Sequence, residues 1–170
     1  MEAAMPDTTP NPAPDASTQS NANLPTEPTL YQGGCAVDAR GSLMFVNPFD
    51  FAGVKRFYTV SNHRQGFVRA WHAHRHQSQY FTVVQGSVLI GAVKIDDWET
   101  PDAEAPVSQI VLSAAKPQVY FIPQGHAIGW MSLTTDAILQ CFSTATFDEC
   151  KDDDIRFDAR HWDIWQVTER

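Results

Sequence analysis

Three histidines stand at every second position in the segment "RAWHAHRH", which spans residues 69–76. Alternate side chains of an extended strand share one face, so His72 and His74 are predicted to point the same way, while His76 falls near the following turn. An imidazole can ligate a metal ion, or it can accept and release a proton near neutral pH. A polar strand surface without any chemical role is the third interpretation of this segment.

These histidines lie in the most basic part of an acidic chain. The 170 residues carry a net charge of −8, yet no Asp or Glu occurs from Phe51 to Ile95. Net negative charge argues against general nucleic-acid binding, which needs cations facing the phosphates. A local cationic patch is typical of a site for a small anionic ligand, although a charged strand surface has the same composition. The cations of this stretch are Lys55, Arg56, Arg64, Arg69, Arg75 and Lys94.

The spacing around the histidines resembles the first sequence motif of the cupins, a class of small β-barrel proteins. That motif has a glycine, five residues, His-x-His, a carboxylate and a second glycine. Here His72 and His74 stand between Gly66 and Gly86, and Gln79 occupies the place of the carboxylate. The resemblance implies a barrel whose histidine-bearing strand faces the interior.

The ligands that a metal-binding cupin would need are incomplete. In the second motif, Pro-x-Gly-x-x-His, the chain has Pro123 and Gly125, but Ile128 replaces the histidine. A catalytic metal site generally has about three protein ligands, usually imidazole or carboxylate. His126 stands two residues earlier and is predicted to turn away from the site. We therefore predict no metal and no cofactor and favour proton transfer, with a metal-dependent cupin as an alternative.

The chain further resembles the metal-independent nucleotide-sugar 3,5-epimerases of the dTDP-4-dehydrorhamnose type over residues 38–166. The similarity lies in "VRAWHAH", in "LSAAKPQVYFIPQGHAIGWMSLTTDAILQCFST" and in "IRFDARHWDIW", in that order. In that family an Arg-Gly-x-His motif supplies a phosphate-binding arginine and the base that removes the proton beside a C4 ketone. The resemblance implies these roles for Arg69 and His72, with Asp158 as the carboxylate that orients His72.

Two residues of the epimerase pattern are replaced in this chain. The family's lysine beside the ketone corresponds to Gln79, whose amide is a weaker donor to an enolate oxygen, and the tyrosine acid corresponds to Cys141 or its neighbour. Tyr58 and Tyr120 are the other candidates for that acid. A sugar-binding cupin without catalytic activity is therefore a further alternative.

The chain is also similar to the dTDP-sugar 3,4-ketoisomerases. Their patterns Asp-x-Arg-Gly-x-Leu, Lys-Arg-x-Tyr and His-Ala-His-Lys correspond to "DARGSL", "KRFY" and "HAHR". In those enzymes both histidines carry the proton between adjacent sugar carbons, which implies a catalytic role for His74 if the reaction is isomerisation. The substrate expected in either case is a nucleotide-diphosphate sugar.

Either reaction needs a desolvated base and a contact that holds the diphosphate. Charge-assisted bonds from Arg69, Arg56 or Arg64 can supply that contact. Aromatic side chains in the barrel are expected to exclude water, and the candidates are Trp71, Phe81, Tyr120 and Trp130.

The elements that position these residues are predicted to be short β-strands. From Tyr31 onward, runs rich in Val, Ile, Phe, Tyr and Thr are separated by Gly, Pro, Asn and Asp, a pattern typical of a sandwich or barrel. The predicted fold is all-β, a double-stranded β-helix of the cupin type over residues 31–170, with a short helix or last strand near the C-terminus. The predicted strands are 42–46, 54–60, 67–74, 79–84, 87–95, 107–112, 118–122, 128–133 and 137–144.

Residues 1–30 are predicted to form a disordered tail, because six of the eleven prolines lie there among small polar residues. This segment has neither Lys or Arg nor a long apolar run, so no signal peptide is expected. No run of about 20 apolar residues suggests a membrane span, and three widely spaced cysteines fit a reducing compartment. We expect a cytoplasmic homodimer without nucleic-acid or membrane partners, and the acidic run 151–154 is interpreted as a solvated loop.

Overall fold

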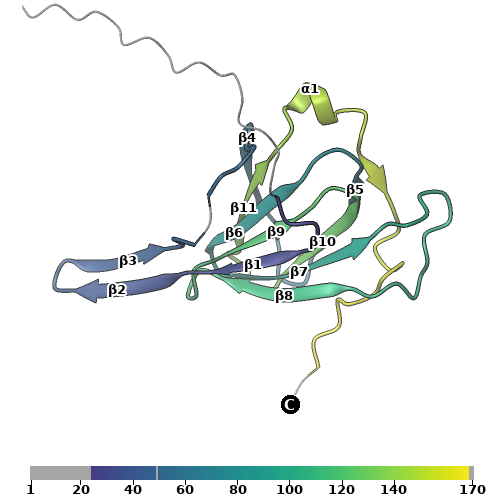
Figure 1. Cartoon of the computed structure of the whole chain (residues 1–170). Coiled ribbons are helices and arrows are strands. Elements are labelled where there is room, and N and C mark those ends of the chain that lie inside the picture. Colours follow the sequence, from purple (N-terminus) through teal and green to yellow (C-terminus); the bar gives the residue numbers. More distant parts are fainter. Residues whose placement is uncertain (1–23, 49, 169–170) are drawn as a thin grey trace, which may run out of the picture.

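Antiparallel strands are the main secondary structure in this computed structural model, which describes residues 24–48 and 50–168 (Figure 1). One five-stranded sheet has the order β1-β9-β6-β11-β4, and a second has the order β12-β5-β10-β7-β8. Strands β2 (Gly34–Asp38) and β3 (Gly41–Phe45) pair only with each other within the described residues. The first sheet contains β1 (Thr29–Gln32), β9 (Gln118–Ile122), β6 (Gln79–Gln85), β11 (Ile138–Ser143) and β4 (Arg56–Ser61). The second contains β12 (Ile155–Arg156), β5 (Val68–His74), β10 (His126–Ser132), β7 (Ser87–Lys94) and β8 (Ser108–Ser113).

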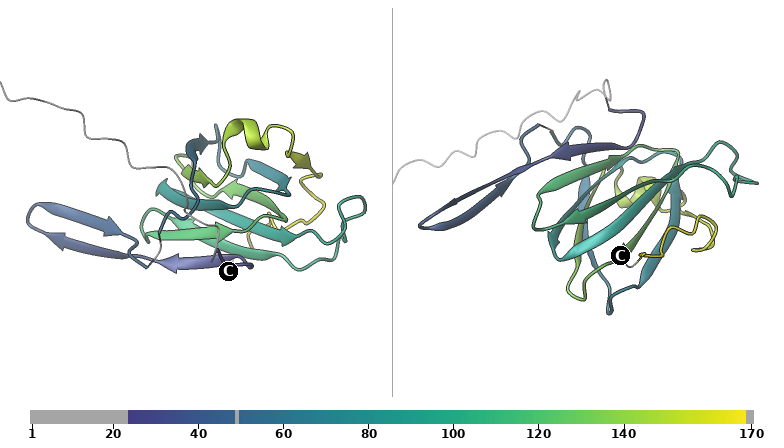
Figure 2. Two further views of the ribbon diagram at one scale, coloured as in Figure 1. Left: turned by 45° about the horizontal axis from the view of Figure 1, so that its top comes forward. Right: turned by 90° about the horizontal axis from the view of Figure 1, so that it is seen from below.

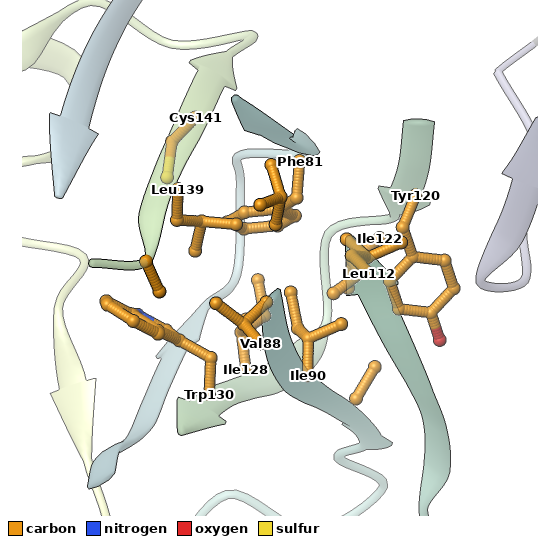
Figure 3. Packing of buried hydrophobic residues seen from close by; sticks show 13 residues of the cluster. Phe81, Val88, Ile90, Leu112, Tyr120, Ile122, Ile128, Trp130, Leu139 and Cys141 are labelled. Carbon is orange, nitrogen blue, oxygen red and sulfur yellow. The ribbon is translucent and has the colours of Figure 1, made fainter. Parts of the chain in front are cut away.

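The chain passes from one sheet to the other at every connection from β4 to β7 and again from β8 to β11. This winding closes the two sheets into the double-stranded β-helix of the cupins, as the sequence predicted. Alternation along each strand sends one set of side chains between the sheets. Figure 3 shows Phe81, Leu139 and Cys141 from the first sheet facing Ile90 and Trp130 from the second.

A second apolar cluster covers the other face of β5. Trp71, which alternates with His72, is fully buried, and its ring lies 5.0 Å from that of Trp165 and 5.4 Å from that of Trp162. Trp71 was expected to line the barrel, but strand alternation places it on the opposite face from His72. The cluster fixes the C-terminal segment, and with it β12, against the second sheet.

The predicted strands are found with their ends shifted by at most two residues, and β9 coincides with the predicted 118–122. The structure adds β1 and β2 (Gly34–Asp38). Near the C-terminus, where the sequence predicted a short helix or a last strand, the structure has both, α1 (Phe147–Cys150) and β12. Strand β1 starts at Thr29, inside the predicted tail, because it pairs with β9. Residues 24–28 of the predicted tail are also described, and Leu24 packs against the buried cluster of Tyr80, Val119 and Phe121. Residues 1–23 lie outside the described residues.

Strands β2 and β3 (Gly41–Phe45) form a hairpin that extends away from the barrel (Figures 1 and 2). Val37 and Leu43 on this hairpin are 77% and 64% exposed, and Met44 and Phe45 are also exposed. An isolated two-stranded hairpin is marginally stable in water. Among the described residues, no helix is long and apolar enough to span a membrane.

Candidate active site

Both sheets and the α1 segment line a cavity of about 480 Å³. Six of the eight predicted site residues border it, and the two that do not are Arg64 and Asp158. Of the aromatic residues expected to exclude water, Phe81 and Trp130 line the cavity, whereas Trp71 and Tyr120 do not. The lining residues are Arg56, Tyr58, Val60, Arg69, His72, His74, Gln77, Gln79, Phe81, Ile128, Trp130, Cys141, Phe147, Cys150, Lys151 and Asp154.

His72 lies in the middle of β5, half-buried, with its Nδ1 atom 3.5 Å from Oδ1 of Asp154. Strand β12 brings this carboxylate close, because Arg156 pairs with His72 in the antiparallel register. Burial lowers the pKa of His72 below its ordinary value of 6.5, and Arg156 lowers it further, while Asp154 opposes both. The imidazole is therefore neutral at neutral pH, which is the form that a general base requires.

The carboxylate beside His72 belongs to Asp154 and not, as predicted, to Asp158. The carboxylate of Asp158 accepts the backbone N–H of Arg160 at 2.7 Å and closes a turn. The antiparallel pairing of Arg156 with His72 explains the difference. Continuing this register places Asp158 beside Ala70, nearer the start of β5, and Asp154 beside His74, at its end.

His74 shares the cavity-facing side of β5 with His72, as strand alternation predicted. Its Nδ1 atom contacts the backbone carbonyl of Asp153. Because a carbonyl oxygen only accepts, a hydrogen bond at this contact requires a proton on Nδ1. His76 is exposed beyond the end of β5 and does not line this cavity.

The opposite sheet presents a neutral, buried set of polar groups to the same cavity. Nε2 of Gln79 donates to the hydroxyl of Tyr58 at 2.9 Å, and Cys141 pairs with Tyr58 on the adjacent strand. Burial and the neighbouring Cys141 raise the pKa of Tyr58, and burial raises the pKa of Cys141 to about 12. Both groups keep their protons at physiological pH, so Cys141 is a buried thiol and Tyr58 an intact O–H donor.

The guanidinium of Arg69 is held in place by the buried side-chain amide of Asn62. Its Nε donates to Oδ1 of Asn62 at 2.8 Å, and Nδ2 of Asn62 donates to Oγ of Ser132 at 2.8 Å. Because Nε alone carries this contact, the fork of terminal N–H groups can face an anion. Asn62 was not predicted from the sequence, since a single Asn before a strand has no distinguishing pattern.

The other predicted cations differ in their placement. The guanidinium of Arg56 lies over the ring of Tyr58 and donates to the Ala145 carbonyl at 3.2 Å, so it is fixed at the cavity wall. Arg64 instead projects from the loop before β5 over the ring of Phe67 and stays outside the cavity. Its exposed loop has no strand pairing to turn the side chain inward.

Ile128 lines the cavity where the second cupin motif has a histidine, whereas His126 is buried outside it. Nδ1 of His126 lies 3.2 Å from the carbonyl of Gln124, at the very start of β10. In the described part of the chain, no group of three or more His, Cys, Asp or Glu side chains is arranged to hold a metal ion.

The acidic run "KDDD" (151–154) supplies more of the site than its sequence suggested. Lys151 and Asp154 line the cavity, while Asp153 is buried beside the end of β5. The run was interpreted as a solvated loop, because composition alone does not distinguish a free acidic loop from one pinned by neighbouring strands. The one sequence signal for its position is that the run directly precedes "IRF" (residues 155–157), which alternates as a strand does.

The barrel and the histidine strand that faces its cavity define the chain as a cupin. The family model for dTDP-4-dehydrorhamnose 3,5-epimerase matches residues 36–169, and the chain belongs to this family. Family membership indicates an enzyme that acts on dTDP-sugars. The resemblance inferred from the sequence is thereby confirmed.

Solved structures of epimerases and of a ketoisomerase share the fold. The dTDP-4-dehydrorhamnose 3,5-epimerase from Sulfolobus tokodaii is 21% identical, with a TM-score of 0.67 over 83% of this chain and 82% of that one. The Bacillus anthracis epimerase with TDP and pyrophosphate bound is 18% identical, with a TM-score of 0.68 over 85% and 87%. The 3,4-ketoisomerase QdtA from Thermoanaerobacterium thermosaccharolyticum, in complex with TDP, is 21% identical, with a TM-score of 0.59 over 82% and 95%. Comparison with curated proteins gave no significant match.

Proposed function

We propose that the chain is an epimerase that inverts a carbon next to the ketone of a dTDP-4-keto-6-deoxyhexose. The proposal rests on the placement of His72 and Tyr58, which line one cavity from opposite sheets. Inversion needs a base on one face of the sugar ring and an acid on the other. Membership of the epimerase family supports the same reaction class.

In the proposed reaction, Nε2 of His72 takes the proton from the carbon beside the ketone. The electron pair of the broken C–H bond moves to the ketone oxygen, where the amide of Gln79 stabilises the enolate. The hydroxyl of Tyr58 then gives a proton to the same carbon from the opposite face. Proton exchange with solvent returns the imidazolium and the phenolate to their starting forms, and no metal or cofactor takes part.

Arg69 is proposed to bind the diphosphate, with Arg56 and Lys151 adding positive charge at the cavity. The support of Arg69 by Asn62 at 2.8 Å holds the guanidinium in one orientation, which lowers the entropic cost of a bidentate contact. TDP in the solved Bacillus anthracis and QdtA structures supports a thymidine nucleotide as the carrier. The buried faces of Trp130 and Phe81 would exclude water from the sugar.

A 3,4-ketoisomerase is the second candidate, and the orientation of His74 favours it. Both imidazoles line the cavity from one strand, and Nδ1 of each is engaged by the 153–154 segment. Two bases on the same face can take a proton from C3 and deliver it to C4. The hydroxyl proton on O3 is lost to solvent and O4 gains one from solvent, so the ketone moves from C4 to C3.

Incubation with dTDP-4-keto-6-deoxyglucose in heavy water, followed by NMR of the sugar, tests the proposal. We expect deuterium at a carbon beside the ketone together with the inverted epimer, and the same result for His76→Asn, which changes a histidine outside the cavity. Movement of the ketone to C3 would establish the ketoisomerase instead. If no carbon exchanged its proton while TDP still bound, the result would indicate a sugar-binding cupin without catalytic activity.

We further propose that the protein is a homodimer that packs through the β2–β3 hairpin. Pairing of Val37 with Ser42 and of Ala36 with Leu43 places apolar side chains on both faces of the hairpin. A second copy related by a two-fold axis can cover these faces symmetrically.

Size-exclusion chromatography with light scattering tests this assembly. The wild-type chain is expected at twice the monomer mass, and the double variant Val37→Asp/Leu43→Asp at the monomer mass. Val111→Asp on β8 is the matched control, since Val111 is 51% exposed but lies on the barrel. A monomeric wild type, or a dimer that survives the double variant, would refute the hairpin interface.

A further inference from the structure

Asp153 is buried although it stands in a run of three aspartates. Its two carboxylate oxygens accept the backbone N–H groups of Arg75 and His76, each at 2.9 Å. These two residues directly follow His74 in the chain. The backbone carbonyl of the same Asp153 contacts Nδ1 of His74. One residue therefore binds the end of β5 through its side chain and the imidazole through its main chain.

The segment that carries Asp153 is itself fixed on both sides. Before it, Thr146 and Glu149 form a reciprocal capping box on α1, and Glu149 pairs with Lys55 at 2.7 Å. After it, β12 pairs with β5, and the backbone N–H of Asp153 donates to the Cys150 carbonyl at 3.1 Å. The carbonyl that faces His74 is thus held in place independently of any ligand.

We propose that Asp153 is a positioning residue that keeps His74 in the Nδ1–H tautomer. A neutral imidazole can carry its proton on either nitrogen, and an acceptor at Nδ1 selects one of them. The lone pair then lies on Nε2, the nitrogen left to accept a proton within the cavity. The catalytic consequence of this orientation rests on the second candidate function, the 3,4-ketoisomerase, in which His74 carries the proton, whereas the tautomer itself rests on neither function.

Long-range proton–nitrogen NMR on the ¹⁵N-labelled full chain reads the tautomer directly, with the His74 signals assigned by their loss in His74→Gln. The wild type is expected to show the Nδ1–H form. Asp153→Ala removes the two side-chain contacts that join this carbonyl to the end of β5, and it should shift the tautomer ratio toward Nε2–H by about three- to tenfold, the equivalent of one net hydrogen bond. Asp152→Ala removes the same charge from the exposed neighbouring residue and should leave the wild-type signals unchanged.

The deuterium-exchange assay supplies the second readout. For the ketoisomerase reaction, Asp153→Ala should lower kcat by about tenfold with KM nearly unchanged, since a misdirected acid–base group affects proton transfer more than binding. Asp153→Asn keeps one acceptor oxygen, so its kcat and its tautomer ratio should lie between those of Asp153→Ala and the wild type. This variant replaces Asp153→Ala in both measurements if Asp153→Ala does not fold.

A His74 tautomer ratio in the Asp153 variants equal to that of Asp152→Ala would overturn the proposal. A changed tautomer with an unchanged kcat would remove the catalytic consequence and leave a structural clamp. If the wild type shows no exchange with any sugar, the proposed function fails, and the tautomer measurement still decides the role of Asp153.

Discussion

On one wall of the cavity the imidazole of His72 lies beside a carboxylate and near a guanidinium, whereas on the other wall the hydroxyl of Tyr58 contacts an amide and a thiol. The pKa of His72 is lowered and that of Tyr58 is raised, and burial is the main cause of both shifts. Burial disfavours whichever form is charged. The same environment therefore produces a neutral base from the histidine and a protonated acid from the tyrosine.

The two walls also differ in how their groups are positioned. Tyr58 and Gln79 both lie on strands that pair with β11 in the first sheet, and this strand pairing fixes them. The histidines depend on contacts from a separate segment, residues 153–156, which is sequence-distant from β5. Substitutions in that segment are thus expected to alter the base without changing the acid.

The largest effect is expected when the base is removed. His72→Asn should slow both deuterium exchange and inversion by about a thousandfold, within the range typical of general-base removal. The measurement is the initial rate of deuterium uptake at saturating sugar nucleotide. An exchange rate within tenfold of the wild type would show that another group takes the proton.

Removal of the acid should separate deuterium exchange from inversion. Tyr58→Phe is expected to lower the rate of inversion by about a hundredfold while deuterium exchange falls much less, because His72 still takes the proton and returns it to the same face. Comparing the rate of deuterium exchange with the rate of inversion by NMR distinguishes the role of His72 from that of Tyr58. Equal losses of exchange and inversion would mean that Tyr58 acts on the enolate oxygen rather than on carbon.

A smaller effect is expected for the anion contact. Arg69→Gln should raise KM and weaken TDP binding by at least about tenfold, since a charge-assisted hydrogen bond to phosphate contributes roughly 1.5–3 kcal/mol. Isothermal titration with TDP measures the change. Arg64→Gln is the matched control, because Arg64 lies outside the cavity, and an equal loss in both variants would point to general charge attraction.

The smallest effect is expected on the pH profile. A base with a lowered pKa stays unprotonated to lower pH, so kcat/KM should fall only as the pH drops below 6.5. Arg156→Gln removes a charge that lowers the pKa of His72, which should move this acid limb to higher pH. Asp154→Asn removes a charge that raises it, so the limb should move to lower pH. Shifts in the same direction for both variants would contradict the pairing seen around His72.

The sequence by itself was sufficient for the barrel and for most of the residues that face its cavity. Alternation put His72 and His74 on one face, and the cupin spacing identified Gln79 and Ile128 as their neighbours. These inferences succeed because side-chain direction in a strand repeats every two residues, so local spacing fixes which face a residue occupies.

Only the tertiary structure decided which groups meet across the cavity. Asp154 rather than Asp158 lies beside His72 because the register of β12 against β5 sets the pairing. Tyr58 reaches Gln79 because β4 and β6 both flank β11. Register between strands distant in sequence depends on packing of the whole barrel, here including the tryptophan cluster that fixes the C-terminal segment, and no local spacing in the chain encodes it.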